Sequence, residues 1–119
     1  MAANPLPTRG EIWFAHLPTD GAAKPPRPVI IVSVDSRNRH ERADTVLVVP
    51  LTMTIHKENA ASVFLAAGET GLSDDCAARP DNLTMIRKTD LLEPRHALRR
   101  VSDRRICEIA AKLRLAVGC

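Results

Sequence analysis

Short runs of apolar residues, separated by polar loops that contain Gly and Pro, dominate the first three quarters of the chain. The run at 27–34 is apolar almost without interruption, which predicts a strand buried on both faces. The other runs are rich in β-branched and aromatic residues, which also favour strands. The expected strands are 10–17, 27–34, 45–51, 62–67, at most a short one within 75–79, and 82–88.

Proline and glycine mark the expected ends of these strands. Pro50 lacks a backbone donor, which predicts an edge position or a bulge near the end of the strand at 45–51. Gly68 is expected to close the strand at 62–67. The polar segment 35–44 is expected to be a loop, and the Pro-rich residues 1–8 are expected to form a loose tail.

One helix is predicted, at the C-terminal end. Ser102 is a typical N-cap, Asp103 suits the first turn, and Gly118 suits the end of a helix. Several short strands followed by one helix favour a mainly β fold, a strongly bent sheet or barrel capped by the helix, in a single domain over 1–119. One apolar stripe at helical spacing is formed by Ile106, Ile109, Ala110, Leu113 and Val117.

The charge of the chain is unevenly distributed. The net charge is +3, but residues 85–119 carry nine basic and four acidic side chains, while residues 54–84 have a net charge of −3. A basic C-terminal third fits a polyanionic partner such as nucleic acid. It fits equally well a solvated helix face, so charge alone leaves both interpretations open.

The three cysteines do not predict a metal site or a disulfide framework. Cys76, Cys107 and Cys119 are widely spaced and form no Cys-x-x-Cys or Cys/His cluster. No Gly-rich phosphate loop is present, so no cofactor is expected. No leader pattern and no run near the ~20 apolar residues of a membrane span is found, which predicts a cytoplasmic protein that does not bind membranes.

Two polar residues at strand ends form a candidate site. Arg27 begins one predicted strand, and Thr52 follows the end of the next. If these neighbouring strands pair antiparallel, the start of one lies beside the end of the other. A planar guanidinium and a hydroxyl would then meet at one rim of the sheet, where they could bind a phosphate. The alternative is an ordinary surface ion pair between Arg27 and Asp20 or Glu11.

A series of short motifs resembles the MazF/PemK family of bacterial toxins. Each motif is weak alone, but they occur in the family's order through residues 9–117. They are Arg9-Gly10-Glu11-Ile12-Trp13, Arg27-Pro28-Val29-Ile30, Pro50-Leu51-Thr52, Gly71-Leu72 with Asp75-Cys76, and Asp81-Asn82-Leu83-Thr84-Met85-Ile86-Arg87-Lys88 with Leu91.

The resemblance implies an SH3-like β-barrel with a C-terminal α-helix that works as a homodimer. It implies sequence-specific, metal-independent cleavage of single-stranded mRNA, which inhibits translation until a cognate antitoxin binds. The family's catalytic arginine and threonine fall on Arg27 and Thr52. The expected RNA contacts are Lys24, Thr54, His56 and Asn82.

The chain departs from the family pattern at two places. Ala22 and Ala23 follow Gly21 where members often carry an acidic residue, and Asn82 stands where some members have Gln. Both places lie near the RNA surface in the family, so the cleavage sequence is left open.

Metal-free cleavage would use the neighbouring 2′-hydroxyl of the RNA as the nucleophile. Arg27 could stabilise charge on the phosphate and Thr52 could position it. Arginine is a poor general base, because its pKa lies above ~12. The loop residues His16, His40, His56 and His96 are therefore rivals for proton transfer or solvated bystanders, with His16 and His56 nearest the site in sequence.

Two alternatives to the endoribonuclease share the same barrel. A gyrase-poisoning toxin would end in Trp-Gly on its last helix, whereas the only tryptophan here is Trp13. A catalytically weakened RNA-binding barrel is compatible with the altered loop at 21–26.

Overall fold

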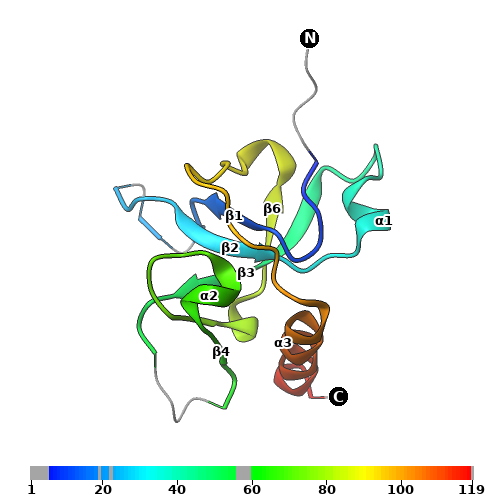
Figure 1. Cartoon of the computed structure of the whole chain (residues 1–119). Helices are drawn as coiled ribbons and strands as arrows, with labels where there is room; N and C mark the ends of the chain where they lie inside the picture. The colour runs from blue at the N-terminus through cyan, green and yellow to red at the C-terminus, as the bar shows by residue number, and fades with distance from the viewer. Residues whose placement is uncertain (1–5, 19, 22, 56–59, 119) are drawn as a thin grey trace.

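A computed structural model describes residues 6–18, 20–21, 23–55 and 60–118 of the chain (Figure 1). Six strands form its sheet and one long helix follows them, so the expected mainly β fold with a C-terminal helix is confirmed. The strands are β1 (Ile12–Ala15), β2 (Arg27–Ile31), β3 (Thr45–Thr52), β4 (Val63–Leu65), β5 (Cys76–Ala78) and β6 (Thr84–Arg87). The helical segments are α1 (Asp35–Asn38), α2 (Ala67–Thr70), η1 (Pro80–Asn82), η2 (Lys88–Asp90) and α3 (Asp103–Ala116).

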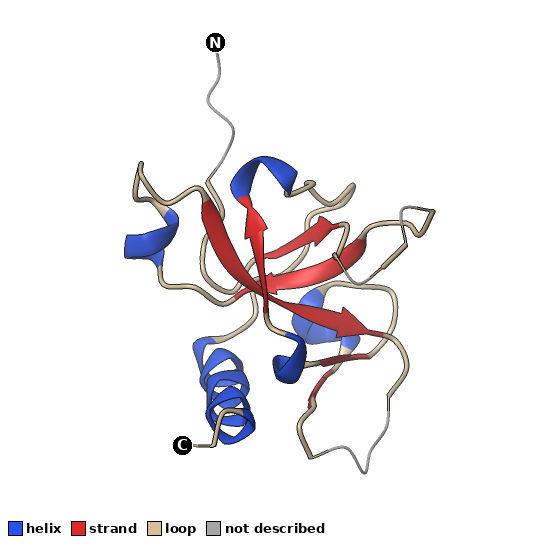
Figure 2. Ribbon diagram, turned by 180° about the vertical axis from the view of Figure 1, so that it is seen from behind, coloured by secondary structure: helices blue, strands red, loops and turns tan. Residues whose placement is uncertain are grey.

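The long strand β3 connects the two parts of an antiparallel sheet (Figure 2). Its first half, from Thr45 to Val48, pairs with β6, and its middle, from Val48 to Pro50, pairs with β2 on the other side. Its last two residues pair instead with β5, which in turn pairs with β4. Strand β3 therefore changes its partner strand along its length, from β6 to β5, and the sheet bends at this point.

Strand β2 is buried on both faces from Val29 to Ile31, as the unbroken apolar run in 27–34 predicts. Ile30 of β2 belongs to one core cluster, which also contains Ile106 and Ile109 of α3. Its neighbours Val29 and Ile31 belong to a second cluster with Trp13. Because successive side chains of a strand point to opposite faces, a strand between two cores must be apolar at every position.

Of the two positions predicted for Pro50, an edge strand or a bulge, the edge is wrong, because Pro50 lies in the central strand β3. Its carbonyl accepts a hydrogen bond from the Arg79 amide at 3.0 Å, on the side of β3 that faces β5 and β6. Pairing with β6 ends at Val48, and pairing with β5 begins at Leu51. The missing N–H of Pro50 therefore falls in the gap between two partner strands, where no ladder bond is lost.

Two short helices lie where the sequence predicts a loop and the end of a strand. The segment 35–44, expected to be a loop, begins with α1, where the buried Asn38 amide donates to the Ser33 carbonyl at 2.9 Å. Gly68 does not close a strand but lies inside α2. Gly71 ends that helix with φ +82°, a left-handed conformation that favours glycine.

Helix α3 covers one end of the sheet and packs against η1 and β4 (Figure 1). Ser102 is its N-cap, as predicted, and the hydroxyl accepts a hydrogen bond from the Arg105 amide. Only the first part of the predicted apolar stripe is buried, because Val117 lies beyond the helix and is 68% exposed. In the described part of the chain, no helix has the length and apolarity needed to cross a membrane.

Candidate active site

Arg27 and Thr52 lie across the β2–β3 ladder from each other. The ladder pairs Val29 with Pro50, and continuing the same antiparallel register sets Arg27, the first residue of β2, opposite Thr52, the last residue of β3. On its other side, Arg27 pairs with Ala15 of β1. The structure thus brings the two predicted catalytic residues to one rim of the sheet.

Both residues line the same hollow of about 310 Å³. The β1–β2 loop forms one wall and contributes two charged side chains besides Arg27, namely Asp20 and Lys24. The end of β3 forms the other wall, where Thr54 and Met53 follow Thr52. The remaining lining residues are Pro25, Pro26, Pro28 and Leu51.

The hydroxyl of Thr52 is held in place by the chain that follows it. Its Oγ1 accepts a hydrogen bond from the Thr54 amide at 3.2 Å. A hydroxyl that accepts one hydrogen bond still has its own proton to donate. Thr52 can therefore act as a fixed donor toward an oxygen in the hollow.

Arg27 is paired with Asp20, one of the two carboxylates that the sequence offers. Its Nε lies 3.6 Å from Asp20 Oδ2. The Arg27 side chain is 41% exposed, whereas the Asp20 side chain is only 12% exposed. The other carboxylate, Glu11, accepts from the Trp13 indole at 3.4 Å. The pair with Asp20 is thus not an ordinary surface pair, because one partner is largely buried.

Lys24 reaches the hollow through a turn in the β1–β2 loop. Its amide donates to the Gly21 carbonyl at 3.0 Å, and Pro25 and Pro26 then lead directly into β2. Proline restricts the backbone, so this connector holds the exposed lysine beside Arg27. Two cations and one carboxylate therefore face the hollow.

Two predicted RNA contacts are not placed in this hollow. Asn82 is exposed on η1, and it is not one of the residues that line the hollow. His56 lies outside the residues that the structure describes. Of the four expected contacts, the structure brings Lys24 and Thr54 to Arg27 and Thr52.

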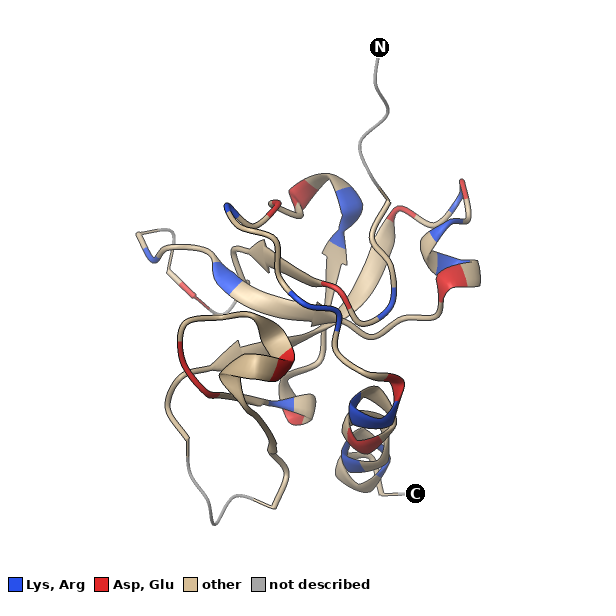
Figure 3. Cartoon of the chain, in the orientation of Figure 1, with Lys and Arg blue, Asp and Glu red and all other residues tan. Residues whose placement is uncertain are grey.

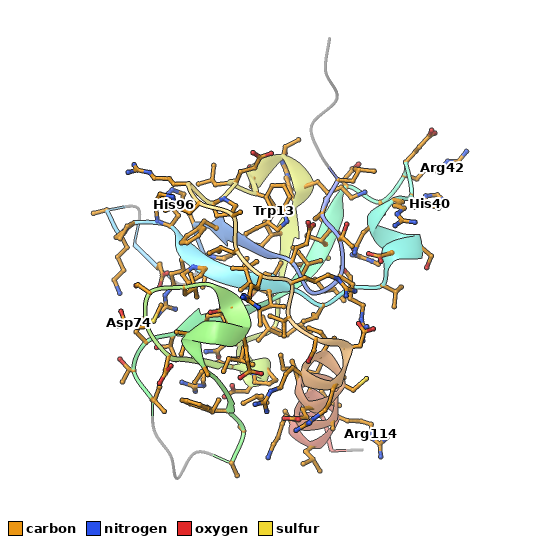
Figure 4. All side chains as sticks on the ribbon, viewed as in Figure 1. Trp13, His40, Arg42, Asp74, His96 and Arg114 are labelled. Atoms are coloured by element: carbon orange, nitrogen blue, oxygen red, sulfur yellow. The ribbon has the colours of Figure 1, made fainter. Side chains whose placement is uncertain are left out.

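The described histidines are exposed and lie outside the hollow. His16 follows Ala15, the strand partner of Arg27, but does not line the hollow. His40 and His96 lie on different sides of the molecule (Figure 4). No histidine among the described residues is therefore in place for proton transfer at Arg27 and Thr52.

Part of the basic charge in the C-terminal third is paired with acidic side chains. Basic segments alternate with acidic ones along α3 (Figure 3). Arg100 pairs with Asp103 at 3.4 Å, and Arg104 pairs with Glu108 at 3.5 Å. Arg105 binds Glu69 of α2 at 2.7 Å. Arg100, Arg104 and Arg105 are thus paired, but Asp103 and Glu108 are already counted in the net charge of +5, so only Glu69 offsets it from outside the segment.

The groups with clearly shifted pKa values lie away from the hollow. Burial raises the pKa of the Cys76 thiol to about 11, which keeps it protonated and unsuited to act as a nucleophile. The Arg9 amide lowers the pKa of Asp35, and the Arg105 side chain lowers that of Glu69. Within the described ranges, no three or more His, Cys, Asp or Glu side chains gather in a way that could hold a metal ion.

Comparison with known proteins gives one consistent family. Residues 8–117 match the model of the PemK-like, MazF-like toxins of type II toxin–antitoxin systems. The chain is 35% identical over 112 residues to the endoribonuclease MazF9 of Mycobacterium tuberculosis, which covers 90% of this chain and 92% of that protein.

Solved structures show the same fold. An endoribonuclease from a Mycobacterial species superposes with a TM-score of 0.72 at 25% identity, covering 96% of this chain and 93% of that one. MazF from Deinococcus radiodurans gives a TM-score of 0.74 at 18% identity, covering 98% of this chain and all of that one. A Mycobacterial endoribonuclease in complex with its cognate antitoxin gives a TM-score of 0.68 at 24% identity, covering 95% and 94%. With the family match over residues 8–117, the chain belongs to the PemK-like, MazF-like toxins of type II toxin–antitoxin systems.

Proposed function

We propose that this chain is an endoribonuclease that cleaves single-stranded mRNA at specific sequences without a metal ion and thereby inhibits translation. The observation that carries the proposal is that Arg27 and Thr52, at the same end of the antiparallel pair β2 and β3, line one hollow. The 35% identical relative, the endoribonuclease MazF9, supports it.

The chemistry follows from the two side chains. The 2′-oxygen of a nucleotide attacks the adjacent phosphorus and loses its proton, while the bond to the 5′-oxygen breaks and that oxygen gains a proton. The products are a 2′,3′-cyclic phosphate and a 5′-hydroxyl. Arg27 would stabilise the charge that builds on the non-bridging oxygens, and the Thr52 hydroxyl would hold the same phosphate in place.

The proton transfers need no dedicated histidine in this scheme. Among the described residues, no histidine lines the hollow, and Arg27 is a poor base. We therefore assign Arg27 to electrostatic stabilisation, and the proton exchanges to water or the substrate. This assignment predicts a slow enzyme whose rate depends on charge stabilisation more than on general base catalysis.

The RNA backbone is expected to enter beside Lys24 and Thr54, which line the hollow with the catalytic pair. Asn82, exposed on η1, is proposed to contact a base farther along the strand, because amide side chains read the edges of unstacked bases. His56 keeps its proposed role as an RNA contact.

The toxin is proposed to act in the cytoplasm as a homodimer with a cognate antitoxin. A solved Mycobacterial relative is an endoribonuclease bound to its antitoxin, which supports such a partner. We expect an acidic, partly disordered antitoxin segment that orders over the RNA-binding surface. The gyrase-poisoning alternative finds no support, because the only tryptophan, Trp13, is 8% exposed and belongs to the core.

The direct test is to incubate the purified protein with long single-stranded RNA in EDTA and to map the fragment ends. We expect discrete cuts with 5′-hydroxyl ends. Arg27→Ala is expected to slow cleavage by about 10²–10³-fold, as loss of a donor to a developing charge typically does. Thr52→Val, which removes only the hydroxyl, is expected to slow it by about 10-fold or more.

Matched controls separate a local effect from a general one. Arg104→Ala removes an arginine whose side chain is 83% exposed on α3, and Thr89→Val removes an exposed hydroxyl in η2. Both are expected to cleave like the wild type. Intact RNA across varied sequences would refute the enzyme, and normal cleavage by a folded Arg27→Ala variant would refute the site.

A further inference from the structure

Asp20 carries a carboxylate oxygen that is buried without a hydrogen bond. Its Oδ2 is shielded from solvent and has no hydrogen-bond partner in the structure. A buried polar atom without a hydrogen bond destabilises the folded protein, and more so when it is charged. Native structures keep few such atoms, and each calls for an explanation. The β1–β2 loop therefore retains this oxygen at a cost to stability.

The group that faces this oxygen is the guanidinium of Arg27. The closest approach is through Nε, at 3.6 Å, which is within ion-pair range but too long for a hydrogen bond. A guanidinium carries five N–H donors in a planar fork. Contact through Nε leaves the two terminal nitrogens available to a ligand in the hollow that Arg27 and Asp20 both line.

We propose that Asp20 is a positioning residue, whose carboxylate holds the Arg27 guanidinium through Nε so that the terminal nitrogens face the scissile phosphate. The proposal rests on the proposed endoribonuclease function. Hydrogen bonds at active sites are often long before the substrate binds and shorten in the reacting complex. The gap at Asp20 would close as the phosphate draws the guanidinium into its final place.

This role concerns the rate more than the affinity. Asp20 cancels one positive charge in the hollow, so it does not help to attract RNA, and Lys24 remains as the second cation. A fixed guanidinium has less orientational freedom to lose when charge builds on the phosphate. Loss of the carboxylate should therefore lower kcat and leave KM nearly unchanged.

The first test is steady-state cleavage of a short single-stranded RNA by Asp20 variants. Asp20→Asn keeps the shape and removes the charge, and we expect kcat to fall about 10- to 100-fold while KM changes less than about 3-fold. Asp20→Glu restores the charge and should recover part of kcat. Asp44→Asn, an exposed aspartate before the opposite end of β3, is the matched control and should cleave like the wild type.

Two outcomes of this test would overturn the proposal. One is an unchanged kcat in Asp20→Asn. The other is a lower KM with an unchanged or higher kcat, which would mean that the carboxylate only competes with the phosphate for Arg27. Circular dichroism and thermal unfolding check that each variant is folded.

The second test shows whether Asp20 acts through Arg27. If it does, adding Asp20→Asn to the Arg27→Ala variant should lower the single-turnover rate by no more than about 2-fold. If the rate losses of the two single variants multiply in full in the double variant, the residues act independently and the proposal is contradicted. A readout without RNA is the Nε–H signal of Arg27 in a ¹H–¹⁵N spectrum, assigned by its loss in Arg27→Ala. Asp20→Asn should shift this signal and speed its hydrogen exchange, while Asp44→Asn should not.

The outcomes also separate this inference from the proposed function. If the wild type cleaves and Arg27→Ala does not, but Asp20→Asn behaves like the wild type with an unmoved Nε–H signal, only the role of Asp20 fails. If the wild type leaves RNA intact, the proposed function fails whatever the spectrum shows, and the positioning role falls with it.

Discussion

Arg105 of α3 holds Glu69 of α2 by two parallel hydrogen bonds, Nε to Oε1 at 2.7 Å and Nη2 to Oε2 at 3.2 Å. The same arginine also donates to Glu108, one turn later on α3, at 3.0 Å. Glu69 in turn accepts from the Ala66 amide at the start of α2. This network connects the C-terminal helix to a helix of only four residues that could not form alone.

Replacement of Glu69 by Gln should destabilise the protein in a pH-dependent way. Arg105 holds the pKa of Glu69 below its ordinary value of 4.5. A depressed pKa stabilises the folded state above pH 4.5, and this contribution is lost as the pH falls through the lower folded-state value. We expect Glu69→Gln to lower the free energy of unfolding by about 1 kcal/mol near neutral pH, since the pair is partly exposed.

Urea unfolding near neutral pH and near pH 3 measures this effect. The difference between wild type and Glu69→Gln should be smaller at the lower pH, because the charge of the wild-type carboxylate is lost as the pH falls through its lowered pKa. Glu41→Gln, in the exposed loop after α1, should resemble the wild type at both values. An equal loss at both pH values would show that the charge of Glu69 is not what stabilises α2.

Replacement of Gly10 by Ala should be costly. Gly10 has φ +92°, and an added Cβ would lie 2.8 Å from the Val101 carbonyl oxygen. Its amide and carbonyl are both hydrogen bonded, to Ile31 and Val101, so the backbone cannot move away. We expect Gly10→Ala to lower the free energy of unfolding by about 2 kcal/mol or more, measured by urea unfolding.

Gly68 provides the opposite case in the same protein. It lies inside α2, and an added Cβ would meet no atom within 4 Å. Because Ala loses less backbone entropy than Gly in a helix, Gly68→Ala should stabilise the protein by about 0.5 kcal/mol. If Gly10→Ala and Gly68→Ala lowered the free energy of unfolding by similar amounts, the contacts around Gly10 would not be as described.

The cysteines should differ in their reactivity toward alkylating reagents. Burial raises the pKa of the Cys76 thiol to about 11, whereas Cys107 is exposed on α3. Since the thiolate is the reactive form, iodoacetamide at neutral pH should label Cys107 in the native protein and spare Cys76. Peptide mapping by mass spectrometry distinguishes the two, and labelling in urea should reach both. Rapid native labelling of Cys76 would contradict its place in the core.

The sequence predicts the strands and the meeting of Arg27 with Thr52 because both depend on local patterns. Apolar runs mark each strand, and antiparallel neighbours bring the start of one beside the end of the other. The short helices depend on distant contacts instead. α2 relies on Arg105, which is 36 residues away, so the sequence around Gly68 gave no sign of a helix.

Pro50 and Asp20 are two further cases in which local sequence patterns do not predict the structure. The expected edge position of Pro50 is wrong because its missing donor falls where β3 changes partners, which only the full topology shows. The sequence predicts Asp20 only as a possible surface partner of Arg27, whereas its side chain is 12% exposed in the structure. Burial of a polar residue in a loop has no periodic signature in the sequence.

The central claim, that Arg27 and Thr52 act on one phosphate, is tested most directly by their energetic coupling. Single-turnover cleavage of one RNA is measured for the wild type, Arg27→Ala, Thr52→Val and the double variant. Two groups that hold the same phosphate act as a unit. The fold-decrease in rate that Thr52→Val causes should therefore be at least about 5 times smaller in the Arg27→Ala background than in the wild type. If the two losses multiply in full, the residues act independently and the account is contradicted.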